Sequence, residues 1–322
     1  MQNKFISIIM SIYNEKEKWI KESIDSILNQ TYTNIEFIIV IDNPNNNIAI
    51  ELIKKYAKKD TRIKHFINEE NKGLIYSLNR ALKYANGDHI ARMDADDISH
   101  KDRLEKQLGY LSDNNLDLIG SNVNLFNENG IFYTTDKLLT HKYITKLLKA
   151  GTIGIVHPTF FAKKEVFKRL NGYKNALHAE DMEFLARVIC YNFRVGNIPD
   201  ILLDCRYNNQ SVTKNNAYIM YKTSEYITNI FNYCIKSKYY NFDENYLEKI
   251  NILEKEIMNF NKKQIILSKV RKELNSKKYI SFFINILKAF YYSPDSVISS
   301  IKINLILKIL KRIENMERGN KK

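Results

Sequence analysis

The first hundred residues alternate short, continuous apolar runs with segments whose apolar residues recur at helical spacing. The apolar runs are residues 5–10, 35–41, 63–67 and 90–93, and the helices are expected at 16–29, 46–59 and 74–86. Strands that are apolar on both faces are typical of parallel sheets that helices cover on both sides. The alternation therefore predicts an α/β fold with a doubly wound, mostly parallel sheet. Such sheets bind ligands at the carboxyl ends of their strands.

Polar residues follow three of these strands. Residues 11–14 follow the first strand, Asp42 follows the second, and Asp94, Asp96 and Asp97 follow the fourth. Neighbouring carboxylates repel one another unless water or a cation lies between them, and oxygen-rich clusters suit Mg2+ or Mn2+. The acids therefore indicate a metal site. The alternative is a solvated turn in which Asp97 or Ser99 caps a helix that begins near Lys101.

The chain continues with mixed elements up to about residue 207. Helices are expected at 101–114, 164–170 and 180–191, and strands at 118–126, 131–135 and 198–207. Residues 155–162, interrupted by His157 and Pro158, are expected to form another strand or an extended loop. A second acidic pair, Glu180 and Asp181, opens the last of these helices. Acids in a first helical turn can simply complement the helix dipole, so the pair is either a cap or a second functional group. We expect one domain over 1–207, with halves 1–97 and 98–207.

Residues 208–322 differ in character and are expected to be helical and basic. Helices are expected at 217–236, 244–275, 278–292 and 295–317. From Arg206 to the end there are 22 Lys and Arg against 10 Asp and Glu, so most of the net charge of +14 lies here. In the last helix an apolar stripe is flanked by basic residues; the stripe is Ile298, Ile301, Leu305, Ile309 and Leu310, and the flanking residues are Lys302, Lys308, Lys311 and Arg312. Such helices either pack on one another or lie in an anionic membrane surface.

Composition and missing motifs exclude several classes of protein. The three cysteines form no C-x-x-C pair, which disfavours a disulfide framework or a zinc site. Neither a dinucleotide fingerprint nor a Walker loop is present. The start has no signal-peptide pattern, and no apolar run approaches the length of a spanning helix. The basic charge is spread over amphipathic helices, which disfavours nucleic acid as a partner. We therefore expect a cytoplasmic protein that can associate peripherally with the inner face of the membrane.

Four stretches occur in a characteristic order over residues 4–200. They are SIIMSIYNE, SIDSILNQTYTNIEFIIVIDNPNN, NKGLIYSLNRALKYANGDHIARMDADD, and NGY followed by HAEDMEFLARV. Together they resemble a family 2 glycosyltransferase with the GT-A fold, of the bacterial type that builds capsule, exopolysaccharide or O-antigen. The resemblance implies that 1–97 is the nucleotide-binding half and 98–207 the acceptor-side half.

The resemblance also implies roles for individual residues. The nucleotide and donor side would be formed by Tyr13, Asn14, Glu15, Asp42, Lys72, Gly73, Asn79, Arg80, Asp94 and Glu180. Asp94 and Asp96 form the D-x-D that holds the metal, and Asp181 matches the catalytic base. His157 and Tyr173 would belong to the donor and acceptor walls. Ile41 replaces the first acid of the usual Asp-Asp pair, and Leu78 stands where many relatives have Arg.

The implied activity is transfer of a sugar from a nucleoside-diphosphate sugar, expected to be a UDP-sugar, to a hydroxyl of a growing or lipid-linked glycan. It would use Mg2+ or Mn2+ and would invert the anomeric carbon. Two alternatives stay open: a catalytically silent scaffold in a polysaccharide complex, and a nucleotidyltransferase, which would lack the usual Gly-rich triphosphate loop. The oligomeric state is left open as well.

Overall fold

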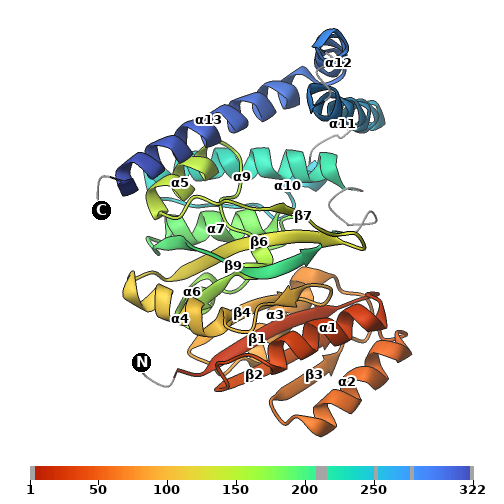
Figure 1. Cartoon of the computed structure of the whole chain (residues 1–322), viewed down its shortest axis with the longest axis vertical. Coiled ribbons are helices and arrows are strands. Elements are labelled where there is room, and N and C mark those ends of the chain that lie inside the picture. Colours follow the sequence, from red (N-terminus) through yellow and green to blue (C-terminus); the bar gives the residue numbers. More distant parts are fainter. Residues whose placement is uncertain (1–3, 208–215, 250–252, 276–278, 320–322) are drawn as a thin grey trace. The chain divides into compact units, whose positions relative to one another are not determined.

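The computed structural model describes residues 4–207, 216–249, 253–275 and 279–319, and it divides into two compact units (Figure 1). Unit 1 comprises Met1–Thr145, Ile153–Asn175 and Glu180–Asn209. Unit 2 comprises Lys146–Thr152, Ala176–Ala179 and Gln210–Lys322.

The N-terminal half of unit 1 is a parallel sheet. Its strands are β1 (Ile6–Ile12), β2 (Ile35–Ile41), β3 (Ile63–Ile67) and β4 (His89–Asp94), in the order β3-β2-β1-β4. The helices between them are α1 (Glu17–Leu28), α2 (Asn47–Lys59) and α3 (Leu74–Tyr84). Every residue of β2 is buried, as expected for an apolar strand covered on both faces. The predicted α/β fold is confirmed.

The C-terminal half of unit 1 extends the same sheet with mixed pairing to nine strands. The added strands are β8 (Phe161–Lys163), β6 (Leu118–Asn127), β9 (Val195–Arg206), β5 (Ile98–Ser99) and β7 (Gly130–Thr134). β8 pairs antiparallel with β4, whereas β6 and β9 pair parallel to each other. The helices are α4 (Arg103–Asp113), α6 (Lys164–Leu170), α7 (Glu180–Cys190) and the single turn η1 (His157–Thr159). β8 therefore places η1 beside the end of β4.

The strand or extended loop expected at 155–162 forms η1, which begins at His157, followed by β8. Two other local expectations differ from the structure. Neither Asp97 nor Ser99 caps α4: the N-cap is Asp102, and Ser99 lies in β5. A helix that was not expected, α5 (His141–Lys149), buries Tyr143, Ile144, Leu147 and Leu148 at the spacing of one helical face.

Unit 2 is helical over its described residues. Its helices are α9 (Ala217–Ser237), α10 (Tyr246–Lys249), α11 (Glu254–Asn275), α12 (Tyr279–Tyr292) and α13 (Pro294–Gly319). Aromatic contacts join them: the Tyr226 ring stacks on Tyr246 with centroids 3.5 Å apart, and Tyr218 meets Phe260 at 5.3 Å. The single helix expected over 244–275 is present as α10 and α11; residues 250–252 lie outside the described part. No helix within the described ranges is both long enough and apolar enough to cross a membrane.

Candidate active site

Three carboxylates meet just after β4. Asp94, Asp96 and Asp97 each have a carboxylate oxygen within 4.8 Å of the others. Asp94 lies beside Ser11 at the carboxyl end of β1, because β1 and β4 pair in parallel. Asp97 is buried and accepts a hydrogen bond from the backbone N–H of Arg206 at 2.8 Å. Two side chains of the cluster, Asp94 and Asp96, therefore remain partly open to solvent.

The acidic cluster carries more negative charge than its surroundings neutralise. Burial raises the pKa of Asp96 to about 7, and repulsion from Asp94 and Glu15 adds to the shift. Burial, with repulsion from Asp94 and Asp96, also raises the pKa of Asp97 well above its ordinary value. Asp96 has no salt bridge within the described part of the chain. The three hard oxygen donors fit a divalent ion such as Mg2+ or Mn2+, which would supply the missing positive charge.

Arg92 is a site residue that the sequence analysis did not identify. Its guanidinium is buried and grips Asp94 with both terminal nitrogens, Nη2 to Oδ1 at 2.5 Å and Nη1 to Oδ2 at 2.7 Å. Its Nε is buried without a hydrogen-bond partner. The sequence feature that could have identified Arg92 is an arginine inside an apolar strand. It lies two residues before Asp94, so both side chains lie on one face of β4.

The second acidic pair approaches Arg92 from the start of α7. The side chains of Tyr173, Glu180 and Asp94 all lie close enough to interact electrostatically with the Arg92 guanidinium. Burial raises the pKa of Asp181 to about 7, repulsion from Glu180 adds to the shift, and Arg92 opposes it. The fold thus brings together two acidic motifs that are more than eighty residues apart in the chain.

His157 connects these groups from η1. Its Nε2 is 3.1 Å from the Tyr173 hydroxyl, and its Nδ1 is 3.6 Å from Glu180 Oε1. Burial, aided by the nearby Arg92, lowers the pKa of His157 well below its ordinary value, so the imidazole is neutral near pH 7. The imidazole therefore shares a hydrogen bond with the Tyr173 hydroxyl and lies beside the Glu180 carboxylate.

Asn79, which was expected on the nucleotide side, is hydrogen-bonded to the backbone of Tyr173. Its side-chain amide donates to the carbonyl of Tyr173 and accepts from the N–H of the same residue, both at 2.8 Å. Gly172, beside it, has φ +71°, and a Cβ there would lie 2.3 Å from Asn79 Oδ1. The amide of Asn79 therefore holds the turn that delivers Tyr173 to the site.

Asp42 is also engaged internally. Oδ1 accepts from the Asn68 amide at 2.6 Å and from the backbone N–H of Lys72 at 2.9 Å, and Oδ2 accepts from the N–H of Gly73 at 2.8 Å. Gly73 has φ +85° and begins α3, a conformation that suits glycine. Asp42 thus fixes the Lys72–Gly73 turn at the edge of the sheet where β1, β2 and β4 also end.

The remaining expected residues lie after β1, in the loop that follows β3 and in α3. Tyr13 and Asn14 are exposed, and Asn14 Oδ1 accepts from the side chain of Asn43 at 2.7 Å. Burial raises the pKa of Glu15, the residue that adds charge to Asp96. The Lys72 ammonium pairs with Glu70. Arg80 donates to the carbonyl of Ile67 at 2.8 Å.

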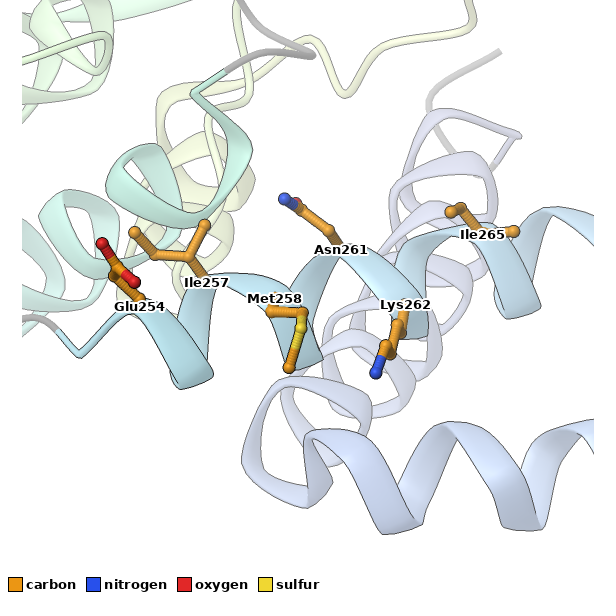
Figure 2. Close-up of a pocket in the computed structure, with 6 residues that line it drawn as sticks. All are labelled: Glu254, Ile257, Met258, Asn261, Lys262 and Ile265. Carbon is orange, nitrogen blue, oxygen red and sulfur yellow. The ribbon is translucent and has the colours of Figure 1, made fainter.

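A separate shallow cavity of about 380 Å3 lies along one side of α11 in unit 2 (Figure 2). Its lining residues are Glu254, Ile257, Met258, Asn261, Lys262 and Ile265. None of the acidic-site residues lines it, and its only carboxylate is Glu254. The convergent polar groups that a catalytic site needs are therefore at β4 and α7 and are absent from this cavity.

Comparisons with known proteins identify the family of this chain. The model of the family "Glycosyl transferase family 2" matches residues 7–170. A glycosyltransferase of Methanocaldococcus jannaschii is 37% identical over 243 residues, 73% of this chain and 83% of that protein. The O-antigen biosynthesis glycosyltransferase WbnJ of Escherichia coli is 36% identical over 223 residues, 69% of this chain and 86% of that protein.

Solved structures show the same fold at lower identity. TarS 1-349 of S. aureus, in complex with UDP-GlcNAc, has a TM-score of 0.57 and 16% identity, covering 98% of this chain and 92% of that one. The mannosyltransferase PcManGT of Pyrobaculum calidifontis, in complex with GDP-Man and Mn2+, has a TM-score of 0.54 and 14% identity, covering 89% and 86%. With its GT-A architecture, its acidic cluster after β4 and relatives of this similarity, the chain belongs to glycosyl transferase family 2.

Proposed function

We propose that this glycosyltransferase moves a sugar from a nucleoside-diphosphate sugar, a UDP-sugar, to a hydroxyl of a growing or lipid-linked glycan in surface polysaccharide biosynthesis. The observation that carries the proposal is the convergence of Asp94, Glu180 and Asp181 around the buried Arg92, with Asp96 beside Asp94. The O-antigen role of WbnJ and the UDP-GlcNAc bound by TarS support the choice of product and donor.

Asp96, with Asp94 beside it, would hold the divalent ion. The ion would stabilise the charge that develops on the departing diphosphate. The protein's own part is to keep these carboxylates in place: Arg92 fixes both oxygens of Asp94, so Asp94 cannot turn away from Asp96. The Mn2+ bound by PcManGT supports a metal at such a site in this fold.

Asp181 would act as the general base. The acceptor hydroxyl oxygen forms a bond to the anomeric carbon, the bond from that carbon to the diphosphate oxygen breaks, and the hydroxyl proton passes to the Asp181 carboxylate. A pKa of about 7 suits this role, because a base works best when its pKa lies near the working pH. Attack from the side opposite the diphosphate inverts the anomeric carbon.

The neighbours of Asp181 support its proposed role. Glu180 raises the pKa of Asp181 by repulsion, and Arg92 limits that rise. The imidazole of His157, which is neutral near pH 7, and the Tyr173 hydroxyl form the wall next to Glu180. Burial raises the pKa of Tyr173 well above its ordinary value, so its hydroxyl stays a hydrogen-bond donor at every working pH.

A thermal-shift titration with UDP, GDP and UDP-sugars, each with and without Mn2+, tests the donor side. A ligand that binds only the folded state raises the melting temperature. We expect a Mn2+-dependent rise with uridine nucleotides that Asp96→Asn abolishes and Asp113→Asn, an exposed acid at the end of α4, retains. If GDP alone raised the melting temperature, the donor would be a GDP-sugar and not a UDP-sugar. No rise with any nucleotide would favour the scaffold.

A further inference from the structure

Helix α13 has two apolar faces, and only one of them is packed. Val297, Leu310 and the side chain of Glu314 are buried. A second set, here called the outer stripe, is between 46% and 61% exposed and consists of Ile298, Ile301, Leu305, Ile309 and Met316. The spacing of the outer stripe, mostly three or four residues, keeps it on one side of the helix, opposite the buried set. An exposed stripe of this length indicates a surface that binds something.

The charges around the outer stripe identify its partner. Lys302, Lys308 and Arg312 are exposed beside it, and none has a carboxylate partner within the described residues. The only acid between residues 296 and 316 is Glu314, which is buried on the opposite face. From Ile298 to Ile309 the stripe is bordered by cations and has no neighbouring acid, and the exposed Asp295 and Glu317 lie beyond this stretch at the two ends of the helix. This central stretch matches the boundary between acyl chains and anionic headgroups.

The preceding helix repeats the pattern. In α12 the side chains of Ile284, Leu287 and Tyr291 are exposed at spacings of three and four residues, and Leu287 and Tyr291 reach 70% and 84%. Lys288 lies exposed on the same side of α12. Tyrosine is suited to a lipid interface, because its ring can lie among apolar groups while its hydroxyl stays in water. Leucine at the neighbouring position can insert among the same apolar groups.

We infer that the outer stripe of α13 binds an anionic lipid surface, with its apolar residues in the acyl boundary and Lys302, Lys308 and Arg312 at the headgroups. A second copy of the chain fits less well. In a symmetric dimer formed stripe to stripe, these three cations would face their own equivalents without any acid between them. The inference extends the proposed function, since a lipid-linked acceptor lies at such a surface, but lipid binding itself needs neither donor nor metal.

Vesicle flotation with the full chain tests the inference. Vesicles of phosphatidylcholine alone are compared with vesicles that contain about a third phosphatidylglycerol, at about 0.1 M and about 0.5 M salt. We expect binding to the anionic vesicles, weakened by salt, and little binding to the neutral ones. Equal binding to both kinds of vesicle, or to neither, would overturn the inference.

Two variants assign the binding to the outer stripe. Ile301→Ser with Leu305→Ser should lower the affinity for anionic vesicles by about 10-fold or more, because both apolar side chains lose their burial in lipid. Lys302→Gln, Lys308→Gln and Arg312→Gln together should lower it on the order of 100-fold. Matched controls in unit 1 are Ile48→Ser with Ile131→Ser, and Lys55→Gln, Lys58→Gln and Lys59→Gln, all at exposed positions. The inference is wrong if the controls lose as much binding as the stripe variants.

Two further readouts distinguish a loss of lipid binding from damage to unit 1 and from the loss of a dimer. The thermal shift with UDP and Mn2+ should be unchanged in the stripe variants, which shows that unit 1 still binds its donor when lipid binding is lost. The mass of the protein in solution should also be unchanged. A stripe variant that turns a dimer into a monomer without weakening vesicle binding would mean that a second copy covers the stripe.

Discussion

Asp42 and Asp96 follow parallel strands of the same sheet, on either side of β1, yet their surroundings differ. Both oxygens of Asp42 accept hydrogen bonds, from Asn68 and from two backbone N–H groups. Asp96 instead faces Asp94 and Glu15, and its pKa rises to about 7. A carboxylate at a strand end that is surrounded by N–H groups stabilises the fold, as Asp42 does. A carboxylate that is surrounded by other carboxylates, as Asp96 is, has no such partners and is available to a positively charged ligand.

The largest expected effect concerns Asp181. Asp181→Asn should fold and bind donor but lose about 100- to 10,000-fold in kcat, because the amide cannot accept the acceptor proton. Transfer assays with a UDP-sugar, read beside the thermal shift, measure both properties. The control is the exposed Asp113→Asn. Glu183→Gln is not a suitable control, because Glu183 is buried and forms an ion pair with Arg187 at 2.6 Å. Normal turnover by Asp181→Asn would remove it from the mechanism.

Arg92 connects the acidic cluster to the second acidic pair, and its removal should be almost as severe. Arg92→Gln leaves the partly exposed Asp94 carboxylate without its charged hydrogen-bond partner, which should cost about 1.5–3 kcal/mol of stability. Arg92→Lys keeps the charge but loses the two-pronged contact, so it should fold and bind Mn2+ more weakly. A Mn2+ titration followed by thermal shift measures this. Unchanged Mn2+ affinity in Arg92→Lys would mean that Arg92 serves the fold alone.

Substituting the two compared acids should change stability in opposite directions. In Asp42→Asn the new amide group would place its own N–H against a backbone N–H that now donates to Asp42. The loss of that hydrogen bond should lower the free energy of unfolding by about 1–3 kcal/mol. Asp96→Asn removes repulsion within the cluster and should raise the melting temperature of the metal-free protein. Urea unfolding without metal compares the two. If both variants were destabilised, the contrast between the strand ends would fail.

The last effect is the pH dependence that Asp181 adds to stability. The pKa of Asp181 is about 7 when folded and about 4 when unfolded, so between these values the folded state keeps a proton that the unfolded state has released. The contribution of this residue to stability is therefore largest below about pH 4 and is lost as the pH rises to about 7. Melting temperatures from pH 5 to pH 8 should fall less in Asp181→Asn than in the parent. Parallel curves would show that the pKa of Asp181 is not raised.

Most strands could be located from local pattern because burial on both faces leaves a continuous apolar run. β2 and β3 lie where the runs 35–41 and 63–67 predicted them. β5 has only two residues and exists because it pairs with β9, more than a hundred residues later. Helix α5 was missed although Tyr143, Ile144, Leu147 and Leu148 carry the helical spacing, so there the signal was present and not used.

In unit 2, the sequence predicted an apolar stripe on the last helix and left open whether it packs or meets a membrane. The structure divides the stripe: Leu310 is buried, whereas Ile298, Ile301, Leu305 and Ile309 are exposed. Periodicity alone cannot make this division, because a helix with apolar residues on two sides gives the same pattern whichever side is covered.

The sequence by itself determined the alternation of strands and helices, the acids after β4 and the acids that begin α7, since these depend on local composition and spacing. Only the tertiary structure decided which groups meet: Arg92 with Glu180, His157 with Glu180, and Asn79 with Tyr173. The physical reason is that charge and hydrogen-bond energies depend on the distance between groups in space and on the exclusion of water. For residues far apart along the chain, neither quantity can be predicted from the local sequence.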